Sequence, residues 1–364
     1  MNNKLKISLI VVIIVVLVIA IVQSSKQSNS QIKIGAVIPL TGTGAFWGEP
    51  AQNGIFLAQD TINKKYGPNA VNILIEDGKS VPPESVTAAQ KLLSVDKVDA
   101  VYTELSGPSG AVAPVVKNAN KIYYYSAFNP SIISQNDNSI KGFLSFYDPC
   151  DVFGRYLQRM DIKKVAIFNQ FAGVAPSCLA ALDKYISKDN ILLFENLPKD
   201  NDYRSILLEI KNFGAGAVIG MTYEGPSLAW IRQMHDLGIK IPVFSGVEAS
   251  LTQKNIDTIG ADKLAGSLYF TPKINQSFIE LYNQKYPNRP GSDLEPAAYA
   301  YEAMVNLAEA MVTCKSNVAC TVQSFRNRNS DAGAISDTKY IDRVLTSTLN
   351  YYLINSGTST PFNI

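Results

Sequence analysis

The feature that most constrains this chain is a regular alternation of apolar, strand-like runs with amphipathic helical stretches between residues 32 and 245. Strands that alternate with helices of about 10–15 residues build parallel sheets with helices on both faces. The sequence therefore predicts an α/β fold made of doubly wound parallel sheets. Strands are expected at 32–39, 71–76, 98–103, 121–126, 163–168, 191–195, 217–221 and 241–245. Helices are expected at 50–65, 83–93, 112–120, 177–187, 203–213 and 226–237.

The length and the net charge of the chain further restrict the class of protein to which it can belong. A chain of 364 residues suits two lobes of ordinary domain size. Hydrophobic residues make up 46% and charged residues 18%, which is typical of a globular protein. The net charge is +2, from 33 basic and 31 acidic residues, so the chain lacks the basic excess of a nucleic-acid-binding protein. Nucleic acid is therefore excluded as an expected partner.

The turns that follow the predicted strands are the expected ligand site. In open parallel sheets, ligands bind outside the carboxyl ends of the strands. We therefore expect a site built from loops, contributed by residues 41–48, 77–80, 104–109, 127–130, 223–226 and 246–250.

The first 25 residues differ from the rest of the chain. Lys4 and Lys6 precede an apolar run from Ile7 to Val22, which is typical of an export signal. Two interpretations remain open: a cleaved signal peptide, or a retained N-terminal membrane anchor, which the lack of a clean A-x-A motif favours. Residues 26–31 are expected to form a polar tether. Lysines on the N-terminal side predict that the body lies outside the cytoplasm.

Four cysteines, Cys150, Cys178, Cys314 and Cys320, allow two disulfides in an exported chain. The six-residue spacing of the last two is plausible for a short loop bridge, which would leave Cys150 to pair with Cys178. The alternative is four buried free thiols. The absence of a C-x-x-C motif and the single histidine argue against a zinc site.

The motifs of enzymes are missing. The only histidine, His235, lies near the end of a predicted helix and has no nucleophile motif around it. The glycines of residues 42–48 do not match the spacing of a dinucleotide-binding turn. We therefore expect a protein that is not an enzyme and needs no cofactor or metal.

Three acids expected in strand-end loops, Glu104, Glu224 and Glu248, favour a cationic or amine-bearing ligand.

Several segments resemble a known family when their order and spacing are taken together. They are IKIGAVIPLTGTGAFWGEPAQNGIFLAQDTIN, DKVDAVYTELSGPSGAVAP, YSAFNP, FSGVEASL, YFTP and EPAAYAYEAM. The chain is similar over about residues 32–337 to the leucine/isoleucine/valine-binding group of type I periplasmic binding proteins.

The resemblance implies two lobes joined by three crossovers that close on a ligand. It places the crossovers near residues 146–149, 270–272 and 334–337. Lobe 1 would then contain 32–146 plus 272–335, and lobe 2 would contain 147–271 plus 336–364.

The resemblance also implies a set of ligand-binding residues. Ser106 and Gly107 match a turn that holds a ligand carboxylate, as expected of backbone donors at a helix N-terminus. Glu248 matches the acid that pairs with an α-ammonium, and the carbonyl or hydroxyl of Ser126 is expected to accept from the same group. Trp47 and Tyr223 match aromatic wall positions. Each of these residues also has an ordinary structural explanation, such as capping or packing.

Two departures from the family pattern concern ligand identity. Phe128 stands where amino-acid binders usually carry a threonine, so the hydroxyl is lost and the backbone amide is kept. Phe128 would fill space or stack on a flat ligand. Near residues 171–176, the family usually has an aromatic residue before a glycine, whereas this chain offers Val174 and Ala175.

The predicted function is therefore that of an extracytoplasmic solute-binding protein of an ABC importer, with permease subunits as partners. Its ligand is expected to be an amino acid or a related amine-bearing compound. The alternative is a ligand-sensing ectodomain that works with a separate membrane signalling partner.

Overall fold

The computed structural model of the chain describes residues 31–245, 251, 253–330, 332–355 and 358–363. The predicted N-terminal segment 1–25 and all but the last residue of the predicted tether 26–31 lie outside this part. Within it, no helix combines the length and apolar character that crossing a membrane requires.

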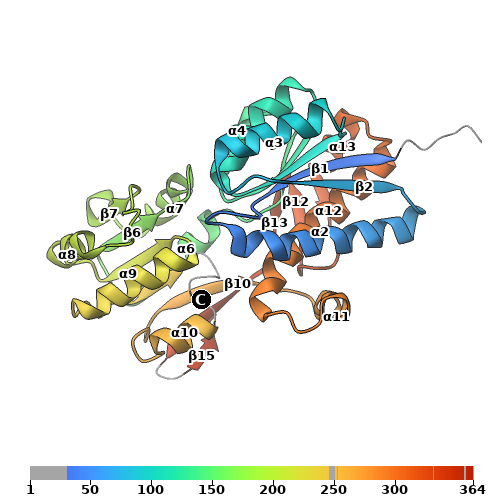
Figure 1. Ribbon diagram of the computed structural model, residues 1–364. Helices are drawn as coiled ribbons and strands as arrows, with labels where there is room; N and C mark the ends of the chain where they lie inside the picture. Colours follow the sequence, from blue (N-terminus) through green and yellow to red (C-terminus); the bar gives the residue numbers. More distant parts are fainter. Residues whose placement is uncertain (1–30, 246–250, 252, 331, 356–357, 364) are drawn as a thin grey trace, which may run out of the picture.

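The described chain forms two separate sheets, each with helices on both faces (Figure 1). The first sheet has the order β11-β12-β13-β5-β4-β3-β1-β2, and β1 to β5 are parallel to their neighbours. Its strands are β1 (Ile32–Ile38), β2 (Val71–Asp77), β3 (Ala100–Glu104), β4 (Ile122–Ser126), β5 (Ser139–Lys141), β11 (Asn327–Asn329), β12 (Lys339–Ile341) and β13 (Val344–Thr346).

The second sheet repeats the same plan. Its order is β15-β14-β10-β9-β8-β6-β7, so each sheet has a parallel part whose strand order reverses beside its first strand. Its strands are β6 (Val165–Asn169), β7 (Ile191–Phe194), β8 (Ala217–Met221), β9 (Val243–Ser245), β10 (Leu268–Pro272), β14 (Leu349–Asn355) and β15 (Thr358–Pro361). We call each sheet with its helices a lobe.

The helices of lobe 1 cover its sheet on both sides. Helices α2 and α12 pack together on one face, where a side chain at Gly54 would collide with the backbone of Ala297. Helices α3 and α4 cover the other face. The helices of this lobe are α2 (Ala45–Tyr66), α3 (Pro82–Ser94), α4 (Ser106–Asn118), α5 (Ile132–Gln135), α11 (Gln276–Lys285), α12 (Leu294–Cys314) and α13 (Val318–Ser324).

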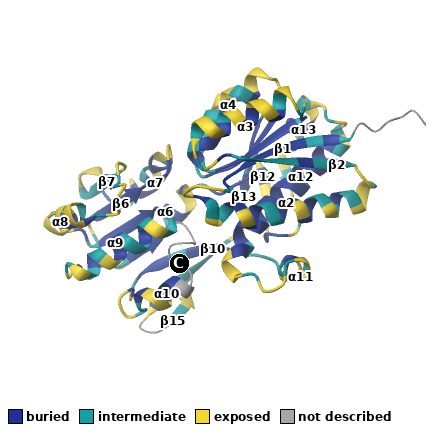
Figure 2. Ribbon diagram, viewed as in Figure 1, coloured by how far each residue is buried: buried dark blue, intermediate teal, exposed yellow. Residues whose placement is uncertain are grey.

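In lobe 2, α6 and α7 cover one face of the sheet, and α8, α9 and α10 cover the other. Alternate residues of β6 enter opposite cores: Val165 and Ile167 face α6 and α7, while Ala166 and Phe168 face α8 and α9. The helices are α6 (Tyr147–Arg159), α7 (Ala175–Leu182), α8 (Arg204–Phe213), α9 (Glu224–Asp236) and α10 (Gln253–Ile259). Figure 2 shows the central strands of both sheets buried and the outer helix faces exposed.

Both predicted disulfides are present. Cys150–Cys178 joins α6 to α7 inside lobe 2, with a Cα–Cα distance of 5.2 Å. Cys314–Cys320 joins the end of α12 to α13 in lobe 1, with a Cα–Cα distance of 5.6 Å. The alternative of four free thiols is therefore wrong.

The chain passes between the sheets three times, but not always where the sequence predicted. The first passage is 142–146 and the second is 273–275, each a few residues from its predicted position. The predicted third crossover at 334–337 is wrong, because β12 and β13 still belong to the first sheet. The chain changes sheet only between β13 and β14, at 347–348, so residues 336–346 do not join lobe 2 as predicted.

Segment 334–337 nevertheless lies at the junction of the lobes. Ile335 forms a β-bridge with Ile274 of the second crossover. The buried carboxylate of Glu302 fixes the segment by accepting hydrogen bonds from the backbone N–H of Ala334 at 3.0 Å and of Ile335 at 3.3 Å. This segment therefore contacts the second crossover without being a crossover itself.

Candidate functional site

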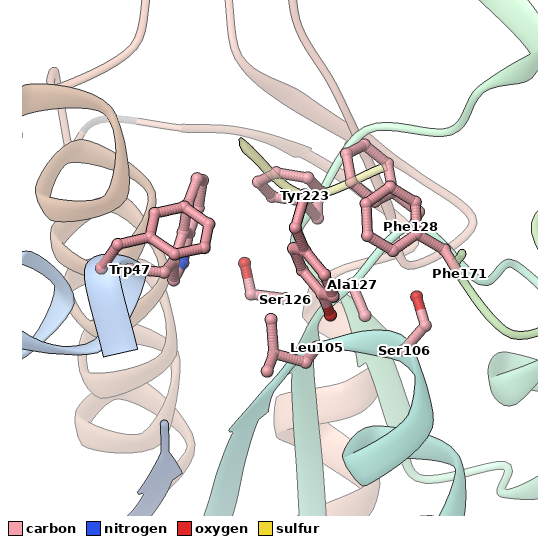
Figure 3. A pocket seen from close by; sticks show the side chains of 10 residues that line it. Trp47, Leu105, Ser106, Ser126, Ala127, Phe128, Phe171 and Tyr223 are labelled. Atoms are coloured by element: carbon pink, nitrogen blue, oxygen red, sulfur yellow. The ribbon is translucent and has the colours of Figure 1, made fainter. Parts of the chain in front are cut away.

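A cavity lies between the carboxyl ends of the two sheets, and both lobes line it (Figure 3). Its volume is about 40 Å³, far below the roughly 300–1,000 Å³ of ordinary ligand pockets, so the lobes must first separate to admit a solute before they can close on it. Lobe 2 contributes Phe171 and Tyr223 to the lining of the cavity. The lining residues from lobe 1 and the first crossover are Phe46, Trp47, Leu105, Ser106, Ser126, Ala127, Phe128 and Phe143.

Ser106 is placed by the sharp passage from β3 into α4. It is the first residue of α4 and is only 5% exposed, so its hydroxyl faces the cavity rather than bulk water. Its Oγ accepts a long hydrogen bond, 3.4 Å, from the backbone N–H of Asn129. The preceding Leu105 has φ 65° and ψ 138°, a strained backbone for a residue with a side chain. Strain of this kind concentrates at functional sites.

The first turn of α2 supplies the opposite wall. Phe46 and Trp47 both lie in this turn, so they belong to a helix rather than to the predicted loop. The Trp47 ring meets Phe143 edge to face with centroids 5.9 Å apart. Phe46 reaches across the gap to Tyr223 of lobe 2, at 6.2 Å.

A second aromatic contact between the lobes closes the other side of the cavity. Phe128 of lobe 1 stacks on Phe171 of lobe 2 with centroids 5.3 Å apart. Phe171 in turn contacts Tyr223 edge to face at 4.9 Å. Burial raises the pKa of Tyr223 to about 12, so its hydroxyl stays neutral at physiological pH. The two lobes thus meet through apolar ring faces around a small polar centre.

The structure brings together most of the residues that the sequence singled out. Five of the seven predicted ligand-binding residues line the cavity: Trp47, Ser106, Ser126, Phe128 and Tyr223. Gly107 follows Ser106 in α4 but does not line the cavity. Glu248 lies outside the described residues, so its pairing with an ammonium stays a prediction. Ligand binding by the other residues is likewise a prediction.

Two predictions about this region need correction. The departure at 171–176 is smaller than predicted, because Phe171 provides an aromatic wall two residues before Gly173. The site is also not built from loops alone, since α2 and α4 begin in it and Tyr223 caps the start of α9. Phe46, Leu105 and Ala127 lie in segments predicted to build the site but were not singled out as ligand-binding residues. Phe143 and Phe171 were missed; the position of Phe171 two residues after the end of β6 was the available signal.

Two acidic residues, Glu224 and Glu104, are sequence neighbours of residues that line the cavity. None of the residues that line it carries a positive charge. Glu224, in the first turn of α9, accepts a hydrogen bond from Asn255 Nδ2 at 2.8 Å. Glu104 was predicted in a loop but ends β3 and is 2% exposed. Within the described part of the chain, no group of His, Cys, Asp or Glu side chains is arranged to hold a metal ion.

A larger cleft adjoins the cavity on the other side of Phe46 and Trp47, which line both spaces. Its volume is about 730 Å³, and it runs between β10 and the first turns of α2 and α12. The two aromatic side chains therefore separate the cavity from this cleft.

Comparison with known proteins places this arrangement in a family. A family described as periplasmic binding protein matches residues 31–343. Leu/Ile/Val-binding protein homolog 7 of Brucella abortus is 23% identical over 293 residues, which is 73% of each chain. Homolog 8 of the same organism is 24% identical over 295 residues, or 72% of each chain.

Solved structures share the fold. A leucine-binding protein of Thermotoga maritima has a TM-score of 0.75 at 18% identity, covering 91% of this chain and 98% of its own. A solute-binding protein from R. palustris in complex with 4-hydroxybenzoate has a TM-score of 0.76 at 17% identity, with 92% and 96% covered. These similarities confirm the predicted α/β fold with two sheets.

Proposed function

Since this chain belongs to the periplasmic binding protein family, in its type I branched-chain amino acid group, we propose that it captures a small carboxylate with an apolar body between its lobes and delivers it to an ABC importer. The family is extracytoplasmic and binds small solutes. The observation that carries the proposal is a cavity at the carboxyl ends of both sheets, lined from both lobes.

The polar end of the cavity suits a carboxylate. Ser106 offers a hydroxyl, and it opens a helix of 13 residues whose first backbone N–H groups carry partial positive charge. Because none of the described residues that line the cavity is basic, the helix-end donors are the described groups that can balance the charge of an anion there. An α-ammonium on the same ligand would add the predicted Glu248 contact, which stays part of the proposal.

The walls suit an apolar body. Trp47, Phe128 and Tyr223 present ring surface to the cavity, and rings favour either a branched aliphatic chain or a flat ring. The relatives named above are described as binding leucine or 4-hydroxybenzoate, which share a carboxylate and an apolar body. This shared chemistry supports the ligand class proposed for the present chain.

A ligand screen followed by one substitution tests the proposal. Amino acids and aromatic acids that raise the melting temperature are taken to calorimetry, because a ligand that binds only the folded state stabilises it. Ser106→Ala should weaken binding of the best carboxylate by about 10- to 100-fold, the cost of a hydrogen bond to a charged group. Ser94→Ala, on the far end of α3, is the matched control. Equal affinity of the two variants would contradict the carboxylate assignment.

Measuring uptake of the solute by cells distinguishes a role in transport from a role in sensing. Cells that lack the protein should lose import of the identified solute if it serves an ABC importer. Import that continues unchanged, together with loss of a transcriptional response to the solute, would favour the sensing alternative.

A further inference from the structure

A buried carboxyl lies beside the cavity and has no role in the site described so far. Glu104 is the last residue of β3, and its register partner on β4 is Ser126. Side chains of register partners on neighbouring strands project to the same face of a sheet. That face is covered by α2, which carries Trp47. Glu104 therefore lies next to two residues that line the cavity, Ser126 and Trp47.

One oxygen of this carboxyl is free. The hydroxyl of Tyr102 donates to Oε1 of Glu104 at 2.8 Å. The other oxygen, Oε2, is buried and makes no hydrogen bond of normal geometry with the described residues, although the Trp47 side chain lies near enough to the carboxyl to lower its pKa slightly. A buried polar group without a partner costs about 1–3 kcal/mol, and native proteins keep few of them. An unpaired oxygen beside a ligand cavity is therefore available to a partner that the ligand brings.

The surroundings keep the carboxyl uncharged. Burial raises the pKa of Glu104 to about 8, while Tyr102 and Trp47 partly oppose the shift. At neutral pH the group is therefore mostly protonated and can both donate and accept a hydrogen bond. Among the described residues that line the cavity, none carries a positive charge that would reverse this state.

We propose that Glu104 is a specificity-determining residue, whose free oxygen pairs with a hydroxyl group at the end of the ligand opposite its carboxylate. The proposal rests on the proposed function, because it takes the Ser106 end of the cavity as the carboxylate end. Figure 3 shows Ser106 and Ser126 on either side of Leu105, so a ligand that bridges them has two separate polar ends. The ligand class is then a small hydroxylated carboxylate.

A hydroxyl fits this position better than an ammonium. A hydroxyl both donates and accepts, as a neutral carboxyl does, so the pair forms without any change of charge. An ammonium would require the buried carboxyl to ionise and to release a proton on binding. Binding of an amine therefore releases a proton, whereas binding of a hydroxyl does not, and this difference can be measured.

Matched ligand pairs test the proposal directly. The pairs are 4-hydroxybenzoate and benzoate, tyrosine and phenylalanine, and threonine and valine, each differing by a hydroxyl. Calorimetry with the full chain should show that the hydroxylated member of one pair binds about tenfold more tightly or better. Glu104→Met should reduce that preference to within about threefold while leaving the affinity for the other member in place. Glu104→Gln, which keeps a donor and an acceptor, should retain part of the preference.

The outcomes separate the two proposals. Equal loss of affinity for both members in Glu104→Met would assign Glu104 a purely structural role, as would a preference that survives in this variant. Release of one proton per ligand at pH 7, measured in two buffers, would replace the hydroxyl by an amine and overturn the proposal. Tight binding of unhydroxylated acids alone would overturn it and leave solute capture standing. Failure of all six acids to bind would contradict the carboxylate assignment itself.

Discussion

Among single residues, Lys141 is the most unusual charged group outside the cavity. It ends β5 with a fully buried side chain, and its Nζ donates to the backbone carbonyls of Phe143 and, at 2.7 Å, of Leu144. Both carbonyls belong to the first crossover, 142–146, and Phe143 lines the cavity. Burial lowers the pKa of Lys141 to about 7. The protonation state of this lysine therefore affects hydrogen bonds that hold the first crossover, which joins the two lobes.

The sign of its pH effect follows from linkage. Between the folded pKa of about 7 and the ordinary value of 10.5, the unfolded chain binds one more proton than the folded chain. This residue therefore makes the free energy of unfolding rise with pH in that window, by up to about 1.4 kcal/mol per pH unit. Lys141→Met should remove the rise, as measured by urea unfolding from pH 7 to 10. Lys117→Met, exposed on α4, is the control; parallel profiles of Lys141→Met and the parent would refute the assignment.

At the scale of residues, the sequence predicted where several side chains lie, and their roles in ligand binding stay predictions. Trp47, Ser106 and Tyr223 were identified from strand-end position and family resemblance, and all three line the cavity. Glu104 was misplaced because an acid after an apolar run is usually exposed, and nothing local shows that α2 covers it. Burial depends on which distant elements pack together in the fold, and the local sequence pattern does not show this packing.

At the scale of elements, the two disulfides should differ in how much they stabilise the fold. Cys150–Cys178 closes a separation of 28 residues and both sulfurs are buried, whereas Cys314–Cys320 closes 6. Loop-closure entropy then predicts losses of about 3.6 and about 2.2 kcal/mol when each bridge is removed. Paired Cys→Ala variants, unfolded in urea, measure the two losses. The reverse order would contradict the entropic explanation.

Element positions were predictable where periodicity was strong, and helix starts were not. The strand at 217–221 was predicted to the residue. Helix α4 begins six residues before its predicted start, because the run Gly-Pro-Ser-Gly indicates a turn although Pro108 is tolerated in the first turn of a helix. Helix α2 likewise begins five residues before its predicted start, which was set at Pro50.

At the scale of the whole molecule, the third crossover escaped prediction for a physical reason. Strands β12 and β13 have three residues each, too few for a visible alternation of polar and apolar positions. Their pairing with the first sheet depends on β5, which is about 200 residues earlier in the chain. The two-lobed plan was nevertheless predictable, because the chain length suits two lobes and the family resemblance implies them.

The lobes also approach closely at Gly173, beside Phe171. Gly173 has φ 71°, and a Cβ there would lie 2.4 Å from the side chain of Asn129 in lobe 1. A larger residue is therefore strained by its backbone and also blocked by the opposite lobe. Gly173→Val should weaken ligand binding at least tenfold by opposing closure, and calorimetry measures it; an unchanged affinity would show that the lobes do not need this contact.

Ligand-driven closure of the lobes is the central claim, and the distance between a dye on lobe 1 and a dye on lobe 2 measures it. All four cysteines are in disulfides, so dyes can be placed selectively on Val95→Cys in lobe 1 and Leu208→Cys in lobe 2, both exposed. Energy transfer between the dyes is then recorded while the best ligand of the screen is added. We expect a saturable rise with the calorimetric dissociation constant, and a smaller rise in the Gly173→Val background. Energy transfer that stays constant while the ligand binds would contradict the claim that the solute draws the two lobes together.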